Sequence, residues 1–399
     1  MAVLSQQIGD FLNKSSWIRR MFDAGAELKR KHGEDRVCDF SLGNPDLPAP
    51  QGVRRGLERI ASRAGDPYCF GYMPNPGFPG VRDRLAEYLT REQGVSVARE
   101  DVMLSCGAAG GINCLLRAVL EPGEEVICPT PHFVEYGFYL SNHGGTLKPV
   151  PAREGDFSLD LEALERAFTE RTRMVLINSP NNPTGQVYSE NELKQLGDLL
   201  QRKNAESSRP VLLVSDEPYR FLTYDGHEVP SVLQYFENSV VISSFSKNLS
   251  LAGERIGYVL LHPEMPHKTE LMDGLVYTNR ILGYVNAPTL GQQVIDEALG
   301  EEVDTSVYVR RRDKLADILS QAGFEFHAPK GGFYFFPKAP GGDDVEFTRI
   351  LQEELLLAVP GSGFGGPGHF RLSFCVPDRV IDNSAPAFQK AMERIGAKD

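Results

Sequence analysis

The sequence lacks the features that mark several common protein classes. Its six cysteines are scattered and none forms a C-x-x-C pair, so zinc ribbons and thioredoxin-like redox motifs are unsupported. No apolar run approaches the ~18 residues that a membrane-spanning helix needs. The 399 residues also contain no internal repeat and no low-complexity tract. A single tryptophan and 24% charged residues are otherwise ordinary for a globular chain.

Basic residues are fewer than acidic residues. Lys plus Arg number 42 against 54 for Asp plus Glu, which gives a net charge of −12 and a pI near 5.3. This balance argues against a general nucleic-acid or anionic-membrane binder, although a local basic pocket for a small anion stays open. The N-terminus shows no apolar signal-peptide core, and scattered cysteines are typical of a reducing compartment. We therefore expect a cytoplasmic protein without nucleic-acid or membrane partners.

Several catalytic and binding motifs are absent as well. The sequence contains no H-E-x-x-H, Walker A, EF-hand or G-x-S-x-G motif. Residues 361–366 do match G-x-G-x-x-G, but Pro367, Gly368 and a strand-like segment follow them instead of a helix. A dinucleotide fingerprint must open a helix after a strand, so we interpret this match as a glycine loop.

The pattern that is present alternates short apolar segments with helical ones. At roughly 150 residues per domain, the length suggests two or three domains. The apolar segments are rich in β-branched residues and alternate little, as expected for buried parallel strands. They span residues 102–105, 125–128, 174–178, 211–215, 240–243 and 256–261, with helix-like stretches such as 112–120 and 190–202 between them. This rhythm predicts an α/β domain with a doubly wound, mostly parallel sheet.

The pattern changes after about residue 286. Helical stretches at 292–299 and 306–321 are followed by apolar segments at 331–336 and 370–375, which predicts a smaller α+β domain. We expect the helix-like residues 17–31 to pack with it. The predicted division assigns residues 46–290 to the large domain, and residues 1–45 with 291–399 to the small one.

Ligands of open α/β sheets bind beyond the carboxyl ends of the strands, so the residues that follow each predicted strand are candidates for a site. Small residues at 106–111 either let backbone N–H groups bind an anion or simply form a tight turn. The segment S-P-N-N-P-T-G at 179–185 is a rigid turn, with a cis peptide possible at Pro183. Asn182 is then either a fixed donor at the sheet edge or part of a plain connection.

Four further candidates are ionisable. Asp216 either caps the next turn or keeps a heterocyclic nitrogen protonated, with Tyr219 as a nearby phenol. Lys247 is either a solvated lysine or a desolvated nucleophile able to form a Schiff base with an aldehyde. Arg255 carries the planar fork suited to a phosphate, and Arg371 lies in an apolar strand, where it needs an internal carboxylate or a substrate carboxylate.

In chain order, the motifs N-N-P-T-G, D-E-P-Y, S-F-S-K, G-E-R-I-G-Y and F-R-L-S resemble those of the class I aminotransferases, pyridoxal-phosphate enzymes of fold type I. The resemblance runs from the motif N-K-S-S at residues 13–16 to Arg371. It implies that Lys247 forms the Schiff base and moves the proton, that Asp216 partners the pyridinium nitrogen, and that Asn182 and Tyr219 bond the phenolic oxygen of the cofactor.

The resemblance also implies the remaining contacts. Phe133 would stack on the ring, and the substrate carboxylate would lie against Gly43, Asn182 and Arg371. Tyr72 would reach the phosphate from a neighbouring subunit, which implies a homodimer with shared active sites. The phosphate cradle would comprise Gly107, Ala108, Ala109, Ser244, Ser246 and Arg255.

Some positions depart from the family pattern. Ala108 and Ala109 stand where relatives often have a hydroxyl or a lysine, so the phosphate contacts would rest more on backbone N–H groups. His132 stands where tyrosine is common, and Glu254 where a bulky aromatic residue is frequent. Neither position is required by the chemistry.

The resemblance predicts reversible amino transfer between an L-amino acid and a 2-oxo acid by ping-pong kinetics. Two alternatives share its scaffold: a pyridoxal-phosphate C–S β-lyase or related lyase, and a non-catalytic regulator that binds the cofactor. The side chain of the substrate is not predicted by these motifs. Candidates to surround it are Tyr136, Arg280, Tyr284 and Asn286, with Arg280 either a second cation for a dicarboxylate or part of a surface salt bridge.

Overall fold

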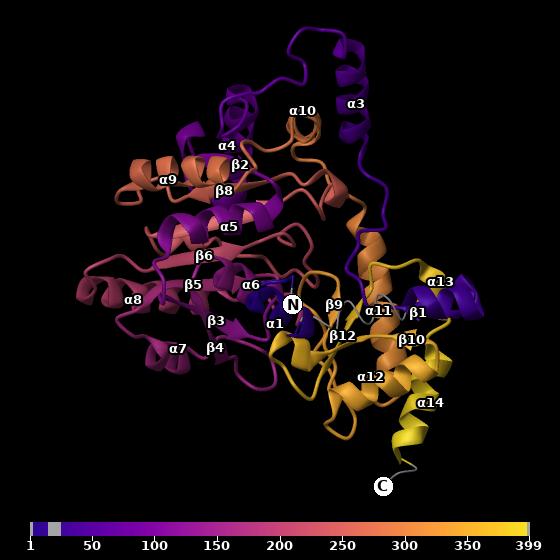
Figure 1. Cartoon of the computed structure of the whole chain (residues 1–399). Helices are drawn as coiled ribbons and strands as arrows, with labels where there is room; N and C mark the ends of the chain where they lie inside the picture. The colour runs from indigo at the N-terminus through magenta and orange to yellow at the C-terminus, as the bar shows by residue number, and fades with distance from the viewer. Residues whose placement is uncertain (1–2, 15–24, 397–399) are drawn as a thin grey trace.

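The computed structural model describes residues 3–14 and 25–396, and its centre is a sheet of seven strands (Figure 1). The strands lie in the spatial order β2-β8-β7-β6-β5-β3-β4. Their bounds are β2 (Val102–Ser105), β3 (Glu125–Thr130), β4 (Thr146–Pro151), β5 (Thr172–Asn178), β6 (Leu212–Asp216), β7 (Ser239–Ser244) and β8 (Gly257–Leu261). Six of them lie where the sequence predicted strands, and the fold is the α/β type I fold that the resemblance implied.

Two features of this sheet differ from the expectation. Strand β8, which we expected to be parallel, pairs antiparallel with both β2 and β7. No α-helix connects β7 to β8, and a parallel arrangement needs such a crossover. Strand β4 was not predicted, because it is an edge strand with two prolines and largely exposed side chains, so it lacks the apolar signal of its neighbours.

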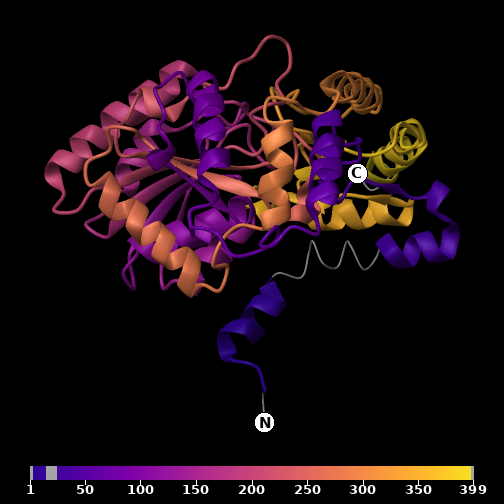
Figure 2. The ribbon, with the colours of Figure 1, turned by 90° about the horizontal axis from the view of Figure 1, so that it is seen from above.

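Helices cover both faces of the sheet (Figure 2). Neighbouring strand residues point to opposite faces, so Val175 packs in one core cluster while Met174 and Leu176 pack in another. Both faces are buried, which explains the weak alternation in the sequence. One face carries α4 (Pro79–Gln93), α7 (Leu161–Ala167) and α8 (Glu190–Glu206), and the other α5 (Gly107–Val119), α6 (Glu135–Asn142) and α9 (Lys268–Ile281).

A second core forms around the C-terminal third of the chain. It is dominated by aromatic rings, among them Phe333, Phe347 and Phe370, and it also takes in Phe40 and Tyr219. Its strands are β1 (Cys38–Asp39) with β10 (Leu356–Leu357), and β9 (Tyr334–Phe335), β11 (Val359–Pro360) and β12 (Phe370–Ser373). Its helices are α11 (Thr305–Gln321), α12 (Asp344–Glu353), α13 (Asp378–Asp382) and α14 (Ala385–Gly396). The division of the chain at residues 45/46 and 290/291 stays a prediction.

Helices α3 (Gln51–Arg63) and α10 (Thr289–Ala298) pack against each other beside the large sheet. Of the helix-like stretch 17–31, residues 17–24 lie outside the described part, as do Ser15 and Ser16 of the N-K-S-S motif. Residues 25–32 form a helix whose Lys29 donates a 2.6 Å hydrogen bond to Asp39. Helix α1 (Gln6–Lys14) contacts α6 through Gln7 and Ser141.

Short 3₁₀ turns complete the fold: η1 (Glu34–Arg36), η2 (Arg99–Asp101), η3 (Val232–Gln234), η4 (Ala252–Glu254) and η5 (Gly361–Phe364). The glycine loop at 361–366 forms η5 between the antiparallel strands β11 and β12, so it is not part of a βαβ unit. All six cysteines are free thiols. Within residues 3–14 and 25–396, no helix has the length and apolar character to cross a membrane.

Candidate active site

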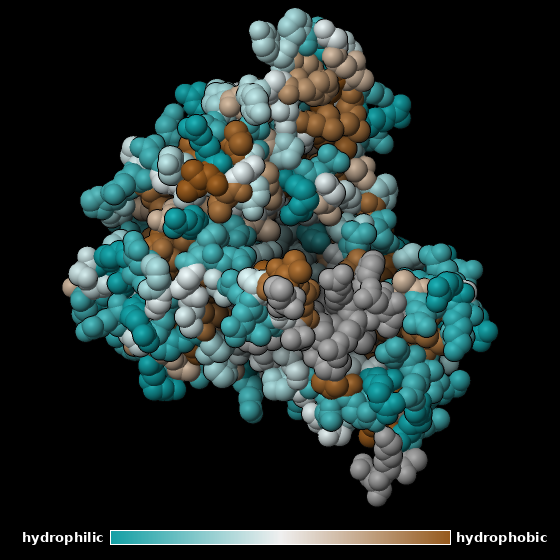
Figure 3. Space-filling view, viewed as in Figure 1, coloured by the Kyte–Doolittle hydropathy of each residue, from teal (hydrophilic) through white to brown (hydrophobic). Residues whose placement is uncertain are grey.

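A cavity of about 370 Å³ lies where the carboxyl ends of β5, β6 and β7 meet the second core. The molecular surface is hollowed between these two parts of the molecule (Figure 3). The lining residues come from eight separate stretches of the chain: Leu42, Gly43, Asn44, Ala108, Ala109, Ile112, Phe133, Glu135, Tyr139, Asn178, Asn182, Asp216, Pro218, Tyr219, Ser244, Ser246, Lys247, Ala252, Arg255, Tyr334 and Arg371.

Asp216 is the last residue of β6 and is buried at the edge of this cavity. Its Oδ2 accepts a 2.6 Å hydrogen bond from the hydroxyl of Tyr136, and its Oδ1 is buried without a partner in the described structure. Burial raises the pKa of Asp216 to about 7. A carboxylate oxygen without a donor is costly in a buried position, so Oδ1 suits an N–H group of a bound molecule.

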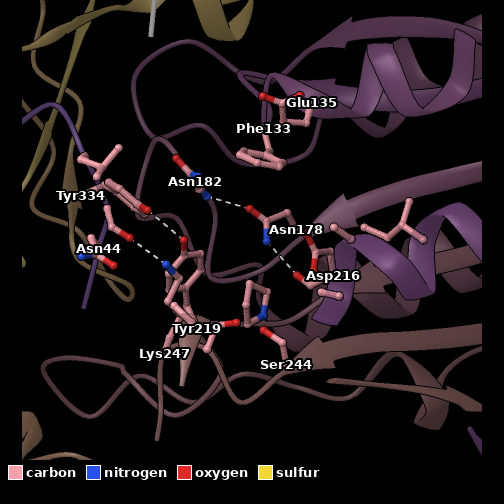
Figure 4. Close-up of a pocket in the computed structure, with 18 of the residues that line it drawn as sticks. Asn44, Phe133, Glu135, Asn178, Asn182, Asp216, Tyr219, Ser244, Lys247 and Tyr334 are labelled. Atoms are coloured by element: carbon pink, nitrogen blue, oxygen red, sulfur yellow. Dashed lines mark hydrogen bonds between the residues drawn. The ribbon is translucent and has the colours of Figure 1, made fainter. Parts of the chain in front are cut away.

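The turn after β5 is held by two asparagines (Figure 4). Asn178 donates a 2.7 Å hydrogen bond from Nδ2 to the backbone oxygen of Asp216. Its Oδ1 accepts a bond of 2.7 Å from the backbone N–H of Asn182. The peptide bond between Asn182 and Pro183 is cis, as the sequence allowed. These bonds fix Asn182 at the cavity wall next to Asp216.

Lys247 lies in the turn that follows β7, and its amine points into the cavity. Its Nζ donates a 2.7 Å hydrogen bond to the backbone oxygen of Gly43. Burial lowers the pKa of Lys247 to about 8, so it is not the solvated lysine of the alternative interpretation. Next to it lies Tyr219, whose ring centre is 6.0 Å from the Lys247 Nζ, and the hydroxyls of Tyr219 and Tyr334 lie 2.8 Å apart. A Cβ at position 43 would collide with the Tyr334 hydroxyl, so this position requires glycine.

Arg371 on β12 is buried and forms no ion pair with any carboxylate in the part of the chain that the structure describes. It donates hydrogen bonds of 3.0 Å to Asn182 Oδ1 and 2.7 Å to the backbone oxygen of Ser41. Its Nε is buried without a partner, and its guanidinium lies 4.6 Å from the centre of the Phe364 ring. The internal salt bridge that the sequence left open is therefore wrong for the described chain, and a buried cation is available for an anion.

The opposite end of the cavity is suited to a phosphate. Helix α5 begins at Gly107, so its N-terminal backbone dipole favours an anion there. Gly107 has a φ of +69°, and a Cβ at this position would lie 2.7 Å from Nη2 of Arg255. Arg255, Ala108 and Ala109 thus lie close together, and Ser244 and Ser246 line the same cavity. Since both alanines lack polar side-chain atoms, their share of the contacts would come from backbone N–H groups.

The comparison with protein families identifies the chain. The family model described as "Aminotransferase class I and II" matches residues 35–388. The chain belongs to this family. It is an aminotransferase, which moves an amino group between an amino acid and a 2-oxo acid, and neither the lyase nor the non-catalytic regulator is favoured by the comparisons.

Relatives of the aminotransferase match over nearly their whole lengths. A probable aspartate/prephenate aminotransferase of Aquifex aeolicus is 32% identical over 93% of this chain and 95% of its own. An asparagine–oxo-acid transaminase of Streptococcus mutans is also 32% identical, over the same shares. The crystal structure of an aminotransferase from Eubacterium rectale superposes with a TM-score of 0.94 at 38% identity and covers 99% of both chains.

Most of the site residues predicted for the aminotransferase meet at this cavity. Gly107 lies beside it through its contact with Arg255. Tyr72 is 92% exposed and does not line the cavity of its own chain. Its predicted contact with the phosphate of a second subunit is not tested by a single chain.

The four residues predicted as candidates to surround the substrate side chain do not line this cavity. Tyr136 is buried behind Asp216 and does not line the cavity, because its side chain turns toward the sheet. Its predicted place beside the substrate is therefore wrong. Arg280, Tyr284 and Asn286 do not line the cavity of their own chain either, and Arg280 is exposed on α9.

The aminotransferase cavity also contains residues that the sequence did not single out. Asn178 ends a strand that was predicted, so its position after the apolar run was the available signal. Tyr334 lies in the apolar segment predicted at 331–336, where no polar pattern showed that its hydroxyl faces a site. Glu135 and Tyr139 lie one turn apart on α6 and both line the cavity.

Proposed function

We propose that this aminotransferase works with pyridoxal 5′-phosphate, held through its aldehyde carbon by Lys247. When bound, this group supplies an electron-accepting ring for the electron pair released at the Cα atom of the substrate. The observation that carries the proposal is one cavity with three unusual groups: an unpartnered buried carboxylate oxygen on Asp216, a lysine with a lowered pKa, and a buried guanidinium without a counterion.

The residues of the chain would divide the remaining work. Asp216 would accept a hydrogen bond from the ring nitrogen and favour its protonated form. Tyr219 and Asn182 would bond the phenolic oxygen, and Phe133 would stack on the ring. The phosphate would lie at the N-terminus of α5, against Gly107, Ala108, Ala109, Ser244, Ser246 and Arg255.

Substrate binding would depend on Arg371. Its planar fork matches a carboxylate, and its Nε has no partner in the described chain. Asn182 and the backbone at Gly43 lie beside it and would complete the carboxylate site. The amine of Lys247 would then take the proton from the Cα atom and return it to the product, as a general acid and base.

An absorbance experiment tests the proposed function. Purified protein is titrated with pyridoxal phosphate and then with a panel of L-amino acids, without any oxo acid. We expect a visible band from the bound cofactor, which some amino acids convert to the pyridoxamine form. A band that persists while pyruvate and ammonia accumulate would indicate a lyase. If no band forms even with excess cofactor, the role of Lys247 is wrong.

We further propose that the enzyme is a homodimer that works in the cytoplasm. Tyr68 and Tyr72, which are 91% and 92% exposed, and the half-exposed Phe70 lie on one loop. Exposed aromatic residues that gather in this way favour an interface with another chain. Tyr72 would reach the phosphate of the second subunit from this loop. Light scattering of the purified enzyme tests the dimer, and Tyr72→Phe should weaken cofactor binding.

The lowered pKa of Lys247 predicts how cofactor uptake depends on pH. Only the neutral amine attacks an aldehyde, and a pKa of about 8 makes it available at lower pH than the usual value of 10.5. We expect the rate of pyridoxal-phosphate uptake by the cofactor-free enzyme to rise with pH around a midpoint near 8. Stopped-flow absorbance between pH 6.5 and 10.5 measures it. A midpoint near 10 would mean that the amine is solvated.

The hydrogen bond from Tyr136 to Asp216 gives a second prediction. This bond lowers the pKa of Asp216 against the larger upward effect of burial. In Tyr136→Phe the carboxylate loses a charge-assisted hydrogen bond, which contributes about 1.5–3 kcal/mol. We expect kcat to fall by roughly tenfold, and the acidic limb of its pH profile to move to higher pH, because the carboxylate must be ionised to hold a protonated ring.

Tyr188→Phe is the matched control for this prediction. Tyr188 is also a buried tyrosine, but it does not line the cavity and does not bond Asp216. We expect its kcat profile to match that of the parent enzyme. If both variants lose activity equally and the acidic limb stays in place, the role assigned to Tyr136 is wrong.

A further inference from the structure

One charged residue of the cavity has no place in the proposed function. Five acidic or basic residues line it: Glu135, Asp216, Lys247, Arg255 and Arg371. Four of them have a proposed partner, namely the ring nitrogen, the aldehyde carbon, the phosphate and the substrate carboxylate. Glu135 remains, and it brings a carboxylate to a site that must also hold the α-carboxylate of an amino acid.

Glu135 begins α6, two residues after Phe133. Its side chain is half-buried, and its carboxylate forms no hydrogen bond or ion pair with any residue that the structure describes. Burial raises the pKa of Glu135. It lies beside Phe133 on the wall of the cavity across from Lys247 and Tyr219 (Figure 4).

Helix capping does not explain this carboxylate. Acids in the first turns of other helices do bond the backbone or a neighbouring cation: Glu192 bonds a backbone N–H at α8, and Glu162 pairs with Arg166 on α7. Glu135 bonds no backbone N–H group of α6. An acid near a helix N-terminus is stabilised by about 0.3–1 kcal/mol at exposed sites, which does not require it to face a cavity.

In the proposed binding mode, the side chain of the substrate would extend along lining residues that include Glu135. The α-carboxylate is held at Arg371 and the Cα atom lies at the amine of Lys247, so the side chain must extend along lining residues that have no other role. These are Leu42, Asn44, Ile112, Glu135, Tyr139, Pro218, Ala252 and Tyr334, and Glu135 is the one among them with a carboxylate. Apart from Lys247, Arg255 and Arg371, no lysine or arginine among residues 3–14 and 25–396 lines the cavity of its own chain to neutralise a second substrate carboxylate.

On the basis of the proposed function, we propose that Glu135 selects amino acids whose side chain ends in an N–H donor, an amide or an amine, over dicarboxylates. A carboxylate side chain would meet a like charge in a partly desolvated cavity, which raises the free energy of its complex. An amide or ammonium group would donate a charge-assisted hydrogen bond to the same oxygens.

Asparagine and aspartate provide the test, because their side chains have nearly the same shape and differ in charge. The kcat/KM of each is measured with the enzyme loaded with pyridoxal phosphate and is divided by the value for alanine. We expect the parent enzyme to prefer asparagine at least tenfold. In Glu135→Gln the charge is lost while the size is kept, and we expect this preference to shrink at least tenfold, mainly through a gain for aspartate.

Glu162→Gln is the matched control, since Glu162 is also an acid in the first turn of a short helix and lies outside the cavity. We expect it to keep the parent preference. A parent enzyme that uses aspartate as well as asparagine would overturn the inference without any variant. So would a preference in Glu135→Gln that stays within twofold of the parent while alanine still converts the cofactor band. If alanine and all other donors fail to convert the band, the proposed function fails and the inference fails with it.

Discussion

Replacing Lys247 by alanine will abolish transamination. No other lysine in the described chain lines the cavity, so nothing there can replace its amine as the anchor of the cofactor and as the proton carrier. Since a positioned acid or base contributes about 10²–10⁴-fold, and the variant loses the covalent anchor as well, we expect kcat to fall by at least ~10⁴-fold. Steady-state assays with an amino acid and a 2-oxo acid measure it, together with loss of the lysine-linked absorbance.

Stability separates this loss of function from misfolding. Because the pKa of Lys247 falls from 10.5 to about 8 in the folded state, its charge opposes folding below pH 8, and this cost disappears as the pH rises toward 10.5. At pH 7 the cofactor-free Lys247→Ala protein should therefore unfold at no lower temperature than the parent. Lys338→Ala, at an exposed lysine that bonds Glu325, should keep full activity. Normal turnover in Lys247→Ala would contradict the assignment.

The sequence predicted the centre of the site better than its surroundings. Asp216, Lys247 and Arg371 each follow or occupy an apolar strand, and strand ends converge in a doubly wound sheet, so their meeting could be expected. That the buried guanidinium of Arg371 lacks a carboxylate partner could not be read from the sequence. Its environment depends on backbone oxygens and on Asn182, which lies 189 positions away along the chain.

Helix α6 shows why the residues that would surround the substrate side chain were not predicted. Tyr136 was one of four candidates beside the substrate, yet it turns toward Asp216, while the adjacent Glu135 lines the cavity. Adjacent residues on a helix point about 100° apart, so the direction in which the helix enters decides which of them reaches the site. That direction depends on the loop around Pro131 and on packing beneath Phe133, which involves residues distant in the sequence.

The limits of the strand prediction have the same origin. A buried strand is recognised by its own apolar residues, so β5 and β6 were found, whereas its direction depends on the connection that precedes it. Strand β8 runs antiparallel because the segment after β7 carries Lys247 and Arg255 instead of an α-helix. The connection without an α-helix, which made the predicted direction of β8 wrong, is thus the one that carries the proposed cofactor anchor, Lys247, and the proposed phosphate ligand, Arg255.

Arg371→Ala should produce the largest change in substrate affinity. The guanidinium is buried, and removing one partner of a buried, hydrogen-bonded charge pair costs about 2–5 kcal/mol. We therefore expect kcat/KM for every amino acid to fall by roughly 10²–10³-fold, with a raised KM, because the clamp both binds and orients the substrate. Arg371→Lys should recover only part of this loss, since a single ammonium cannot form the two parallel bonds of the fork.

Arg312→Ala separates the binding role of Arg371 from a structural one. Arg312 is also buried, stacks on Tyr224 and bonds Asp225 through two nitrogens, but it lies outside the cavity. Its removal should lower the unfolding temperature and leave KM unchanged. In the cofactor-free protein, Arg371→Ala should raise the unfolding temperature. Burial lowers the pKa of Arg371, so its charge is costly to bury and is stabilised only when an anion binds. In the loaded enzyme the same variant should raise KM. A change in KM below about twofold in Arg371→Ala would mean that the substrate carboxylate binds elsewhere.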